Sequence, residues 1–147
     1  MKIVGHYNIQ ATRAKVWEAL LDPNVLVKTM PGCERLEGIG PDEYRATIKI
    51  GIGAVKGTFE GKVKLSDTEP PSRYTMAVEG SGAPGFVRGT AAVELSDVEG
   101  GTRVSYDADI QVGGLVASVG QRLLGGVSKM MLDQFFTKIS AELRGDR

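Results

Sequence analysis

The chain has 147 residues, of which 41% are hydrophobic and 24% charged, and it contains 18 Lys plus Arg against 18 Asp plus Glu. This balance predicts one soluble globular domain over residues 1–147 and excludes the clustered positive charge of a typical nucleic-acid-binding protein. The lone cysteine, Cys33, excludes an internal disulfide and fits a reducing compartment. No apolar run reaches the roughly 18 residues of a membrane span, so we expect a cytoplasmic protein, or one held peripherally at the inner face of the membrane.

The N-terminal part of the chain predicts a strand followed by two short helices. Residues 2–10 alternate between apolar and polar side chains, which is typical of a strand. Residues 11–21 carry apolar side chains at helical spacing. A second helix is predicted from Asp22, as its N-cap, through Pro23 at the first helical position to about Met30.

The middle of the chain predicts antiparallel strands. Residues 44–52 and 55–65 alternate with the two-residue period of half-buried strands, and Gly53-Ala54 between them is the expected hairpin turn. The same pattern locates strands at 72–79, 87–95 and 102–112. The expected order is a strand, two short helices, six antiparallel strands, five of which these patterns locate, and a long helix. The predicted sheet therefore has about seven strands.

After Gly113-Gly114 the apolar period changes to 3.6, which predicts one helix over residues 115–143. Its expected inward face carries Val116, Val119, Leu123, Leu124, Val127, Met131 and Phe135. The fold class is thus α+β, a helix-grip fold in which a curved antiparallel sheet wraps around a long C-terminal helix.

A second apolar stripe lies beside this face, formed by Leu132, Phe136, Ile139 and Leu143. One interpretation is packing against the two short helices. The other is a docking surface for a partner or a membrane.

The apolar register of the strands contains small residues, namely Gly57, Gly61, Gly89, Ala91, Ala46 and Ala108. Small side chains let a sheet curve, and they leave volume that another molecule can fill. The helix also contains Gly120, Gly125 and Gly126 in its first half. We therefore expect an apolar cavity between sheet and helix, with a filled core as the alternative.

Motifs for other chemistry have simpler readings. Residues 80–85 match G-x-G-x-x-G, but a strand follows where a nucleotide site needs a helix, so this segment is expected to join two strands. A single histidine, His6, and a single cysteine cannot form a His/Cys metal cluster, and no base is placed beside Cys33. Asp107 and Asp109 share the solvent face of their strand. No catalytic residue and no metal ligand is predicted.

Several segments together resemble the carbon monoxide dehydrogenase G-subunit family of the START-like, Bet v 1-like (SRPBCC) superfamily. They are residues 16–23 (VWEALLDP), 30–33 (MPGC), 51–59 (GIGAVKGTF), 80–86 (GSGAPGF), 113–124 (GGLVASVGQRLL) and 135–138 (FFTK). Their order and spacing, which cover nearly the whole chain, carry the resemblance.

The resemblance implies a non-enzymatic accessory protein of a molybdenum-containing CO dehydrogenase or related hydroxylase, which recruits that enzyme to the membrane. The superfamily implies an apolar ligand between sheet and helix, for which we expect a quinone or a lipid-like molecule and no covalently bound cofactor. The expected lining residues are Phe59, Met76, Val78, Tyr106, Val116, Val119, Leu123, Val127 and Met131. The alternatives are a polyketide cyclase-like enzyme on the same fold and an adaptor without a cavity.

Overall fold

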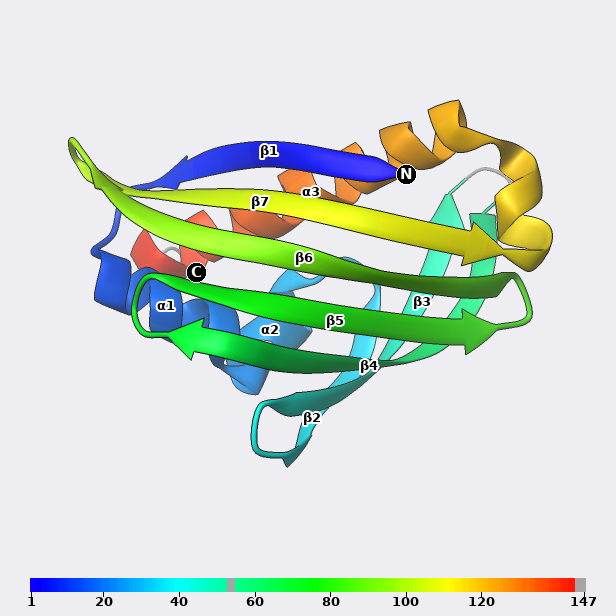
Figure 1. The fold of residues 1–147 in the computed structure, drawn as a ribbon, viewed down its shortest axis with the longest axis horizontal. Helices are drawn as coiled ribbons and strands as arrows, with labels where there is room; N and C mark the ends of the chain where they lie inside the picture. Colours follow the sequence, from blue (N-terminus) through cyan, green and yellow to red (C-terminus); the bar gives the residue numbers. More distant parts are fainter. Residues whose placement is uncertain (53–54, 145–147) are drawn as a thin grey trace.

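A computed structural model describes residues 1–52 and 55–144, so the turn expected at Gly53-Ala54 lies outside the described residues. Seven strands form one sheet, and three α-helices and one 3-10 helix accompany it (Figure 1). The strands are β1 Lys2–Ile9, β2 Cys33–Gly40, β3 Glu43–Ile52, β4 Val55–Glu69, β5 Arg73–Gly82, β6 Gly85–Val98 and β7 Gly101–Gly113. The helices are α1 Arg13–Leu21, α2 Pro23–Thr29, the 3-10 helix η1 Gly114–Val119 and α3 Gln121–Arg144.

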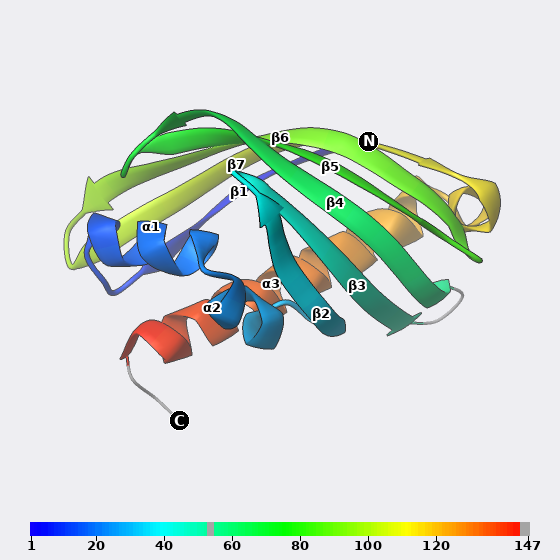
Figure 2. The ribbon, with the colours of Figure 1, turned by 90° about the horizontal axis from the view of Figure 1, so that it is seen from below.

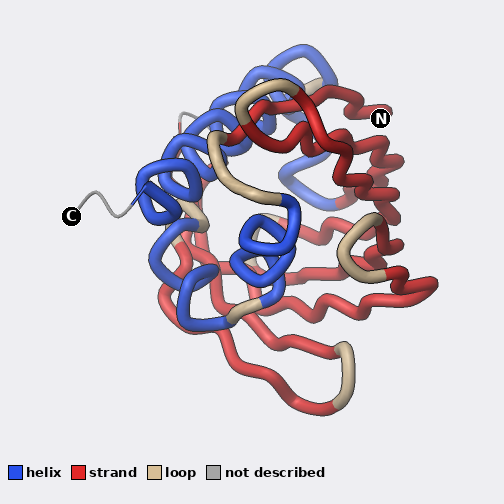
Figure 3. The backbone as a smooth tube through the Cα atoms, turned by 90° about the vertical axis from the view of Figure 1, so that its left-hand side faces the viewer, coloured by secondary structure: helices blue, strands red, loops and turns tan. Residues whose placement is uncertain are grey.

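The sheet is a meander with the order β1-β7-β6-β5-β4-β3-β2. Strand β1 forms one edge of the sheet and pairs antiparallel with β7, from Lys2 opposite Asp109 to Ile9 opposite Thr102. The long strands arch over α3 (Figure 2), and the helices gather on one side of the sheet when the molecule is seen end-on (Figure 3). The helix-grip fold predicted from the sequence is confirmed.

The two short helices begin where their capping residues predict. The Thr12 hydroxyl accepts a hydrogen bond from the Lys15 backbone N–H (3.3 Å), and α1 begins at the next residue after Thr12. The Asp22 carboxylate accepts one from the Asn24 N–H (2.9 Å) at the start of α2, with Pro23 at the first helical position. These side chains satisfy amide groups that have no partner inside the helix. The predicted N-cap role of Asp22 is therefore confirmed.

Strand β2 is the strand that the sequence pattern did not locate. It is an edge strand that pairs with β3 alone, and its register shifts twice, between Cys33 and Arg35 and between Gly38 and Gly40. Six of its eight residues are exposed. A strand held by backbone pairing and not by one buried face has no two-residue apolar period to detect.

The predicted continuous helix over residues 115–143 is wrong in its first turns. Gly120 has φ +88°, a conformation that ends η1 and separates it from α3. The helical phase is therefore reset at Gln121, and an inward face drawn through both segments with one 3.6-residue period does not hold across the break.

The main core lies where α1, α2 and the second half of α3 meet the sheet. Phe136 stacks on Tyr7, with ring centroids 4.5 Å apart, and Trp17 meets Tyr74 edge-on at 5.5 Å. Ile139 is fully buried in the same cluster. The apolar stripe of Leu132, Phe136, Ile139 and Leu143 thus belongs to the core. The packing interpretation is confirmed and the docking interpretation of that stripe is wrong.

Candidate functional site

The inner face of the sheet, which faces α3, carries a band of small residues. Strand pairing places Ala108 opposite Ala91, Gly80 opposite Gly61, and Gly61 opposite Ala46. Gly89 follows Ala91 at the next inward position of β6. The small residues thus form two groups, one on β7 and β6 and one on β5 to β3, and Met76 and Val78 of β5 lie opposite Ala91 and Gly89 between them.

Close approach between strands explains two of these glycines. A Cβ on Gly61 would lie 2.8 Å from the carbonyl oxygen of Glu79, and a Cβ on Gly89 would collide with the carbonyl oxygen of Asp109. Gly80 is different, because its Cβ would meet its nearest neighbour, the Glu60 carbonyl oxygen, at an ordinary 3.7 Å. Gly61 and Gly89 thus allow the sheet to coil tightly, whereas Gly80 leaves space in front of the sheet.

Gly57, which was expected to contribute to the same space, does not. A Cβ at this position would collide with the Pro84 ring, and Pro84 is itself buried. The segment at residues 80–85 joins β5 to β6, as expected, and its proline packs on β4.

The buried apolar residues that the structure describes form two separate clusters. The main cluster surrounds Phe136, and a small one joins Val116 and Leu124 with partly buried neighbours that include Ile50 and Val119. Four residues of the buried hydrophobic core belong to neither cluster, namely Ala46, Phe59, Ala91 and Val127. The interior is therefore divided along its length.

Inward-facing side chains between the two clusters keep part of their surface accessible. They are Ile48, Val78, Ile110 and Met131, none of which belongs to either cluster. Helix α3 makes its main backbone contacts with α1, α2, β1 and η1 and fewer with β3 to β6. These four side chains are therefore less completely covered than those of the two clusters.

Eight of the nine predicted lining residues lie in the interior, where they form three groups. Phe59 and Val127 are buried between the clusters, and Val78 and Met131 lie there partly buried. Met76 and Tyr106 pack against the main cluster, whereas Val116 and Val119 belong to the small one.

Leu123 does not face the interior, since 44% of its side chain is exposed. Its predicted inward position is wrong. Leu123 lies one turn before buried Val127 in the same helix, but in the first turn of α3 the fold covers the side that carries Leu124 and leaves Leu123 in solvent. Ile48 and Ile110, which were not predicted, lie on the inner face, and their place in the alternation of β3 and β7 was the signal that could have found them.

Tyr106 is a predicted lining residue that carries a polar group. Its ring lies over Gly5, where an added Cβ would come within 2.5 Å of the hydroxyl oxygen, and it stacks near Phe136 at 6.1 Å. Burial raises the pKa of its hydroxyl, so this group stays protonated and able to donate a hydrogen bond. Among the described residues, the Tyr106 hydroxyl has no hydrogen-bond partner.

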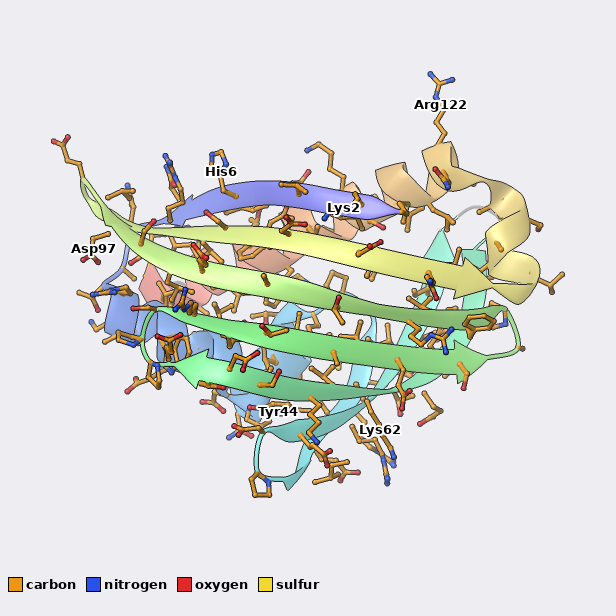
Figure 4. All side chains as sticks on the ribbon, in the orientation of Figure 1. Lys2, His6, Tyr44, Lys62, Asp97 and Arg122 are labelled. Carbon is orange, nitrogen blue, oxygen red and sulfur yellow. The ribbon has the colours of Figure 1, made fainter. Side chains whose placement is uncertain are left out.

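The residues considered for other chemistry lie away from this interior. His6 and Lys2 project from the outer face of β1 (Figure 4), and Lys2 pairs with Asp107 at 2.7 Å. The Cys33 thiol donates to the Arg35 carbonyl oxygen (3.4 Å), and burial raises its pKa, which disfavours the reactive thiolate. No group of three His, Cys, Asp or Glu side chains within residues 1–52 and 55–144 is placed to hold a metal ion.

Hollows on the outer face of the sheet were not predicted. One of about 520 Å³ is lined by side chains that include Arg45, Lys62, Glu79 and Arg88, a row of directly opposed residues on β3 to β6. A second, of about 600 Å³, shares the last three of these residues. Glu79 lies between Lys62 and Arg88 in this row, and Lys62 is labelled in Figure 4. Charged side chains of this kind are typical of a solvated sheet face.

Within the described part of the chain, no helix has the length and apolar character needed to cross a bilayer.

An arched antiparallel sheet around a C-terminal helix, with two short helices after the first strand, defines the Bet v 1-like class of helix-grip proteins. A crystal structure of a conserved protein from Geobacillus kaustophilus has 39% identity and a TM-score of 0.95, and the match covers 99% of this chain and 96% of that one. A protein from Chromobacterium violaceum has 16% identity and a TM-score of 0.74, over 97% and 96% of the two chains. Ara h 8.0201 has 15% identity and a TM-score of 0.70, over 99% and 98%. The last two likenesses show the fold alone.

Residues 5–144 match the model of the carbon monoxide dehydrogenase G-subunit (CoxG) family, so the chain belongs to this family. It is a family of accessory, not catalytic, subunits. No curated protein matches the chain.

Proposed function

We propose that this chain is the ligand-binding accessory protein of a molybdenum-containing CO dehydrogenase or related hydroxylase. It holds an apolar ligand, a quinone or similar isoprenoid, between the sheet and α3, and it recruits the enzyme to the membrane where that ligand exchanges. Family membership supports the enzyme partner. The divided interior supports the ligand.

The observation that carries the ligand proposal is the gap between the two core clusters. Buried Phe59 and Val127 and accessible Val78 and Met131 bound a region that no continuous cluster of side chains fills. An isoprenoid chain that covers these groups gains roughly 25 cal/mol for each Å² of apolar surface removed from water.

A quinone fits this region for a second reason, which is the placement of Tyr106. Its protonated hydroxyl, without a partner among the described residues, is available to donate to a carbonyl oxygen of the ligand head group. The isoprenoid tail would then extend along the small-residue band past Gly80.

A cyclase-type reaction has less support on the same fold. It needs an acid or base facing the ligand. The buried polar residues in the described part of the chain are Thr29 and Thr102, and each donates its hydroxyl to a backbone carbonyl oxygen. Neither hydroxyl is free to transfer a proton. Tyr106 remains as a candidate acid, but no charged residue that could serve as its base is buried among the described residues.

The test is native mass spectrometry of the protein as purified from its host, followed by solvent extraction and identification of the released molecule. We expect bound mass that extracts as an isoprenoid, and rebinding of added quinone by the stripped protein. Protein that is recovered empty and ignores added quinones would refute the ligand proposal.

A matched pair of variants locates the ligand. Gly80→Leu adds a side chain on the inner face at a position where a Cβ meets ordinary contacts, and we expect it to weaken quinone binding at least about tenfold by filling the space. Ser81→Leu adds the same side chain to the exposed outer face one residue later, so binding should be unchanged. Equal effects of the two variants would argue against a ligand on the inner face.

A further inference from the structure

One end of the molecule is built around η1, and we call it the η1 end. It comprises η1, the first turns of α3, the turn between β5 and β6, and the adjoining ends of β3 and β4 (Figure 1). Contacts join these parts, because Val116 of η1 and Leu124 of α3 pack with Ile50 of β3. The Val116 N–H also donates to the Pro84 carbonyl oxygen in the β5–β6 turn (2.7 Å).

Large apolar side chains are exposed at the η1 end. Leu115 is 72% exposed, Leu123 is 44% exposed and Phe86 is 43% exposed. Val116 beside Leu115 is only 4% exposed and anchors η1 to the fold. Leu115 is therefore presented to solvent by a segment that does not need it for packing, and clustered exposure of this kind marks a contact surface.

Basic residues are frequent in the segments that form the η1 end. The three chain segments that meet there, residues 44–59, 80–93 and 110–132, contain no Asp or Glu and six Lys or Arg. The six are Arg45, Lys49, Lys56, Arg88, Arg122 and Lys129. Three of the six have a carboxylate close by, since Lys129 pairs with Asp133 at 3.2 Å, Arg88 lies directly opposite Glu79 and Arg45 directly opposite Glu37. The other three are Lys49, Lys56 and Arg122. Arg122 extends away from the fold at the start of α3 (Figure 4).

We propose that the η1 end docks on an anionic lipid surface, with Leu115 and Leu123 entering the boundary between head groups and acyl chains. Exposed leucines at the same end as Lys49, Lys56 and Arg122 match the requirements of such a surface. A protein partner would be expected to demand a broad interface of about 800 Å² on each side, whereas a bilayer accepts isolated side chains that project from a tip such as η1.

This inference deepens the proposed function, since it names the face through which the ligand site meets the membrane. The small core cluster of η1 lies next to the divided interior, and its partner Val119 is only partly buried. Docking at this end would bring the membrane to the ligand-binding region. The half of the molecule that contains the main core, at the opposite end of α3, would remain in the aqueous phase.

The test is flotation of the full chain, stripped of any ligand, with vesicles of phosphatidylcholine alone or with added phosphatidylglycerol. We expect binding to the anionic vesicles that weakens as salt is raised. The double variant Leu115→Ser/Leu123→Ser should lower the partition coefficient at least about tenfold. Arg122→Gln should lower it about fivefold on anionic vesicles and leave binding to phosphatidylcholine unchanged.

Two matched controls separate docking from general changes of the surface. Val4→Ser removes an exposed valine (67%) from the outer face of β1, and Lys138→Gln removes an exposed cation from the second half of α3. Both should bind vesicles within about twofold of the unaltered protein. Thermal unfolding of every variant checks that it is folded.

Absence of binding to anionic vesicles, or equal losses in the control variants, would overturn the proposal. Normal vesicle binding by the double variant, together with loss of its association with the dehydrogenase, would also overturn it and assign this face to the enzyme. The outcome does not depend on the ligand proposal, because vesicle binding uses stripped protein and ligand identification uses extraction from the host.

Discussion

Two tyrosines on the inner face of the sheet differ in how their hydroxyl groups are used. The Tyr44 hydroxyl donates to the Leu21 carbonyl oxygen at the end of α1 (2.7 Å), whereas the Tyr106 hydroxyl has no partner among the described residues. The same chemical group therefore contributes to stability in one case and is available for binding in the other.

The pair gives a direct prediction. Tyr44→Phe removes a hydrogen bond and should lower the free energy of unfolding by about 1 kcal/mol. Tyr106→Phe should change stability by less and should weaken quinone binding. Urea denaturation measures the first effect and a quinone titration the second. If Tyr106→Phe binds quinone as tightly as the unaltered protein, the hydroxyl has no role in holding the head group.

Tyr74 predicts how stability depends on alkaline pH. Burial raises the pKa of its hydroxyl above the ordinary value near 10, so the unfolded chain loses this proton first. The contribution of Tyr74 to the free energy of unfolding is complete below about pH 10. As pH rises further, this free energy declines by at most about 1.4 kcal/mol per pH unit.

Urea denaturation between pH 9 and pH 11 checks this slope. Tyr74→Phe removes the titrating group and should flatten the slope, whatever the stability of the variant at neutral pH. An unchanged slope in Tyr74→Phe would assign the alkaline transition to other groups.

At the scale of elements, the glycines of the C-terminal segment have different roles. Gly120 ends η1 with φ +88°, whereas Gly126 lies inside α3 with nothing within 4 Å of an added Cβ. Gly126→Ala should stabilise the protein by about 1 kcal/mol through helix propensity. Gly120→Ala should destabilise it by a similar amount or more, since alanine is strained at positive φ. Thermal unfolding distinguishes the two signs, and stabilisation by both would contradict the break at Gly120.

The inward face of α3 can be tested in the same way. Phe136 is 5% exposed and stacks on Tyr7, so Phe136→Ala should cost about 3–5 kcal/mol. Leu123 is 44% exposed, so Leu123→Ala should stay within about 0.5 kcal/mol. Urea denaturation measures both changes. Similar losses of unfolding free energy in the two variants would indicate that Leu123 faces the interior, as the sequence pattern predicted.

For the molecule as a whole, the divided interior predicts that stability depends on the ligand. A ligand present at about 100 times its Kd raises the free energy of unfolding by about 2.7 kcal/mol, because it binds the folded state alone. Stripped protein should therefore melt at a lower temperature, and added quinone should restore the original melting temperature. A melting temperature that does not respond to stripping or to quinone would indicate an interior that is complete without a guest.

Much of the fold could be predicted from local patterns. Alternation located β1 and β3 to β7, and Asp22-Pro23 located the start of α2, because a side chain and its nearest neighbours decide these features. Edge strand β2 has no such pattern and depends on pairing with β3. The inward placement of Phe59 and Val127 follows from period alone, whereas that of Leu123 failed because the first turn of α3 is covered only on the side of Leu124.

The sequence by itself determined the class of fold, the small residues on the inner face and the absence of carboxylates from residues 110–132, since all of these are properties of order and composition. Only the tertiary structure decided that Phe136 and Ile139 are core residues, that the core is divided, and that Leu115 and Leu123 face solvent. The physical reason is that burial depends on which surfaces meet in three dimensions. A helical or strand period records which residues share a face, and it does not record what lies opposite that face.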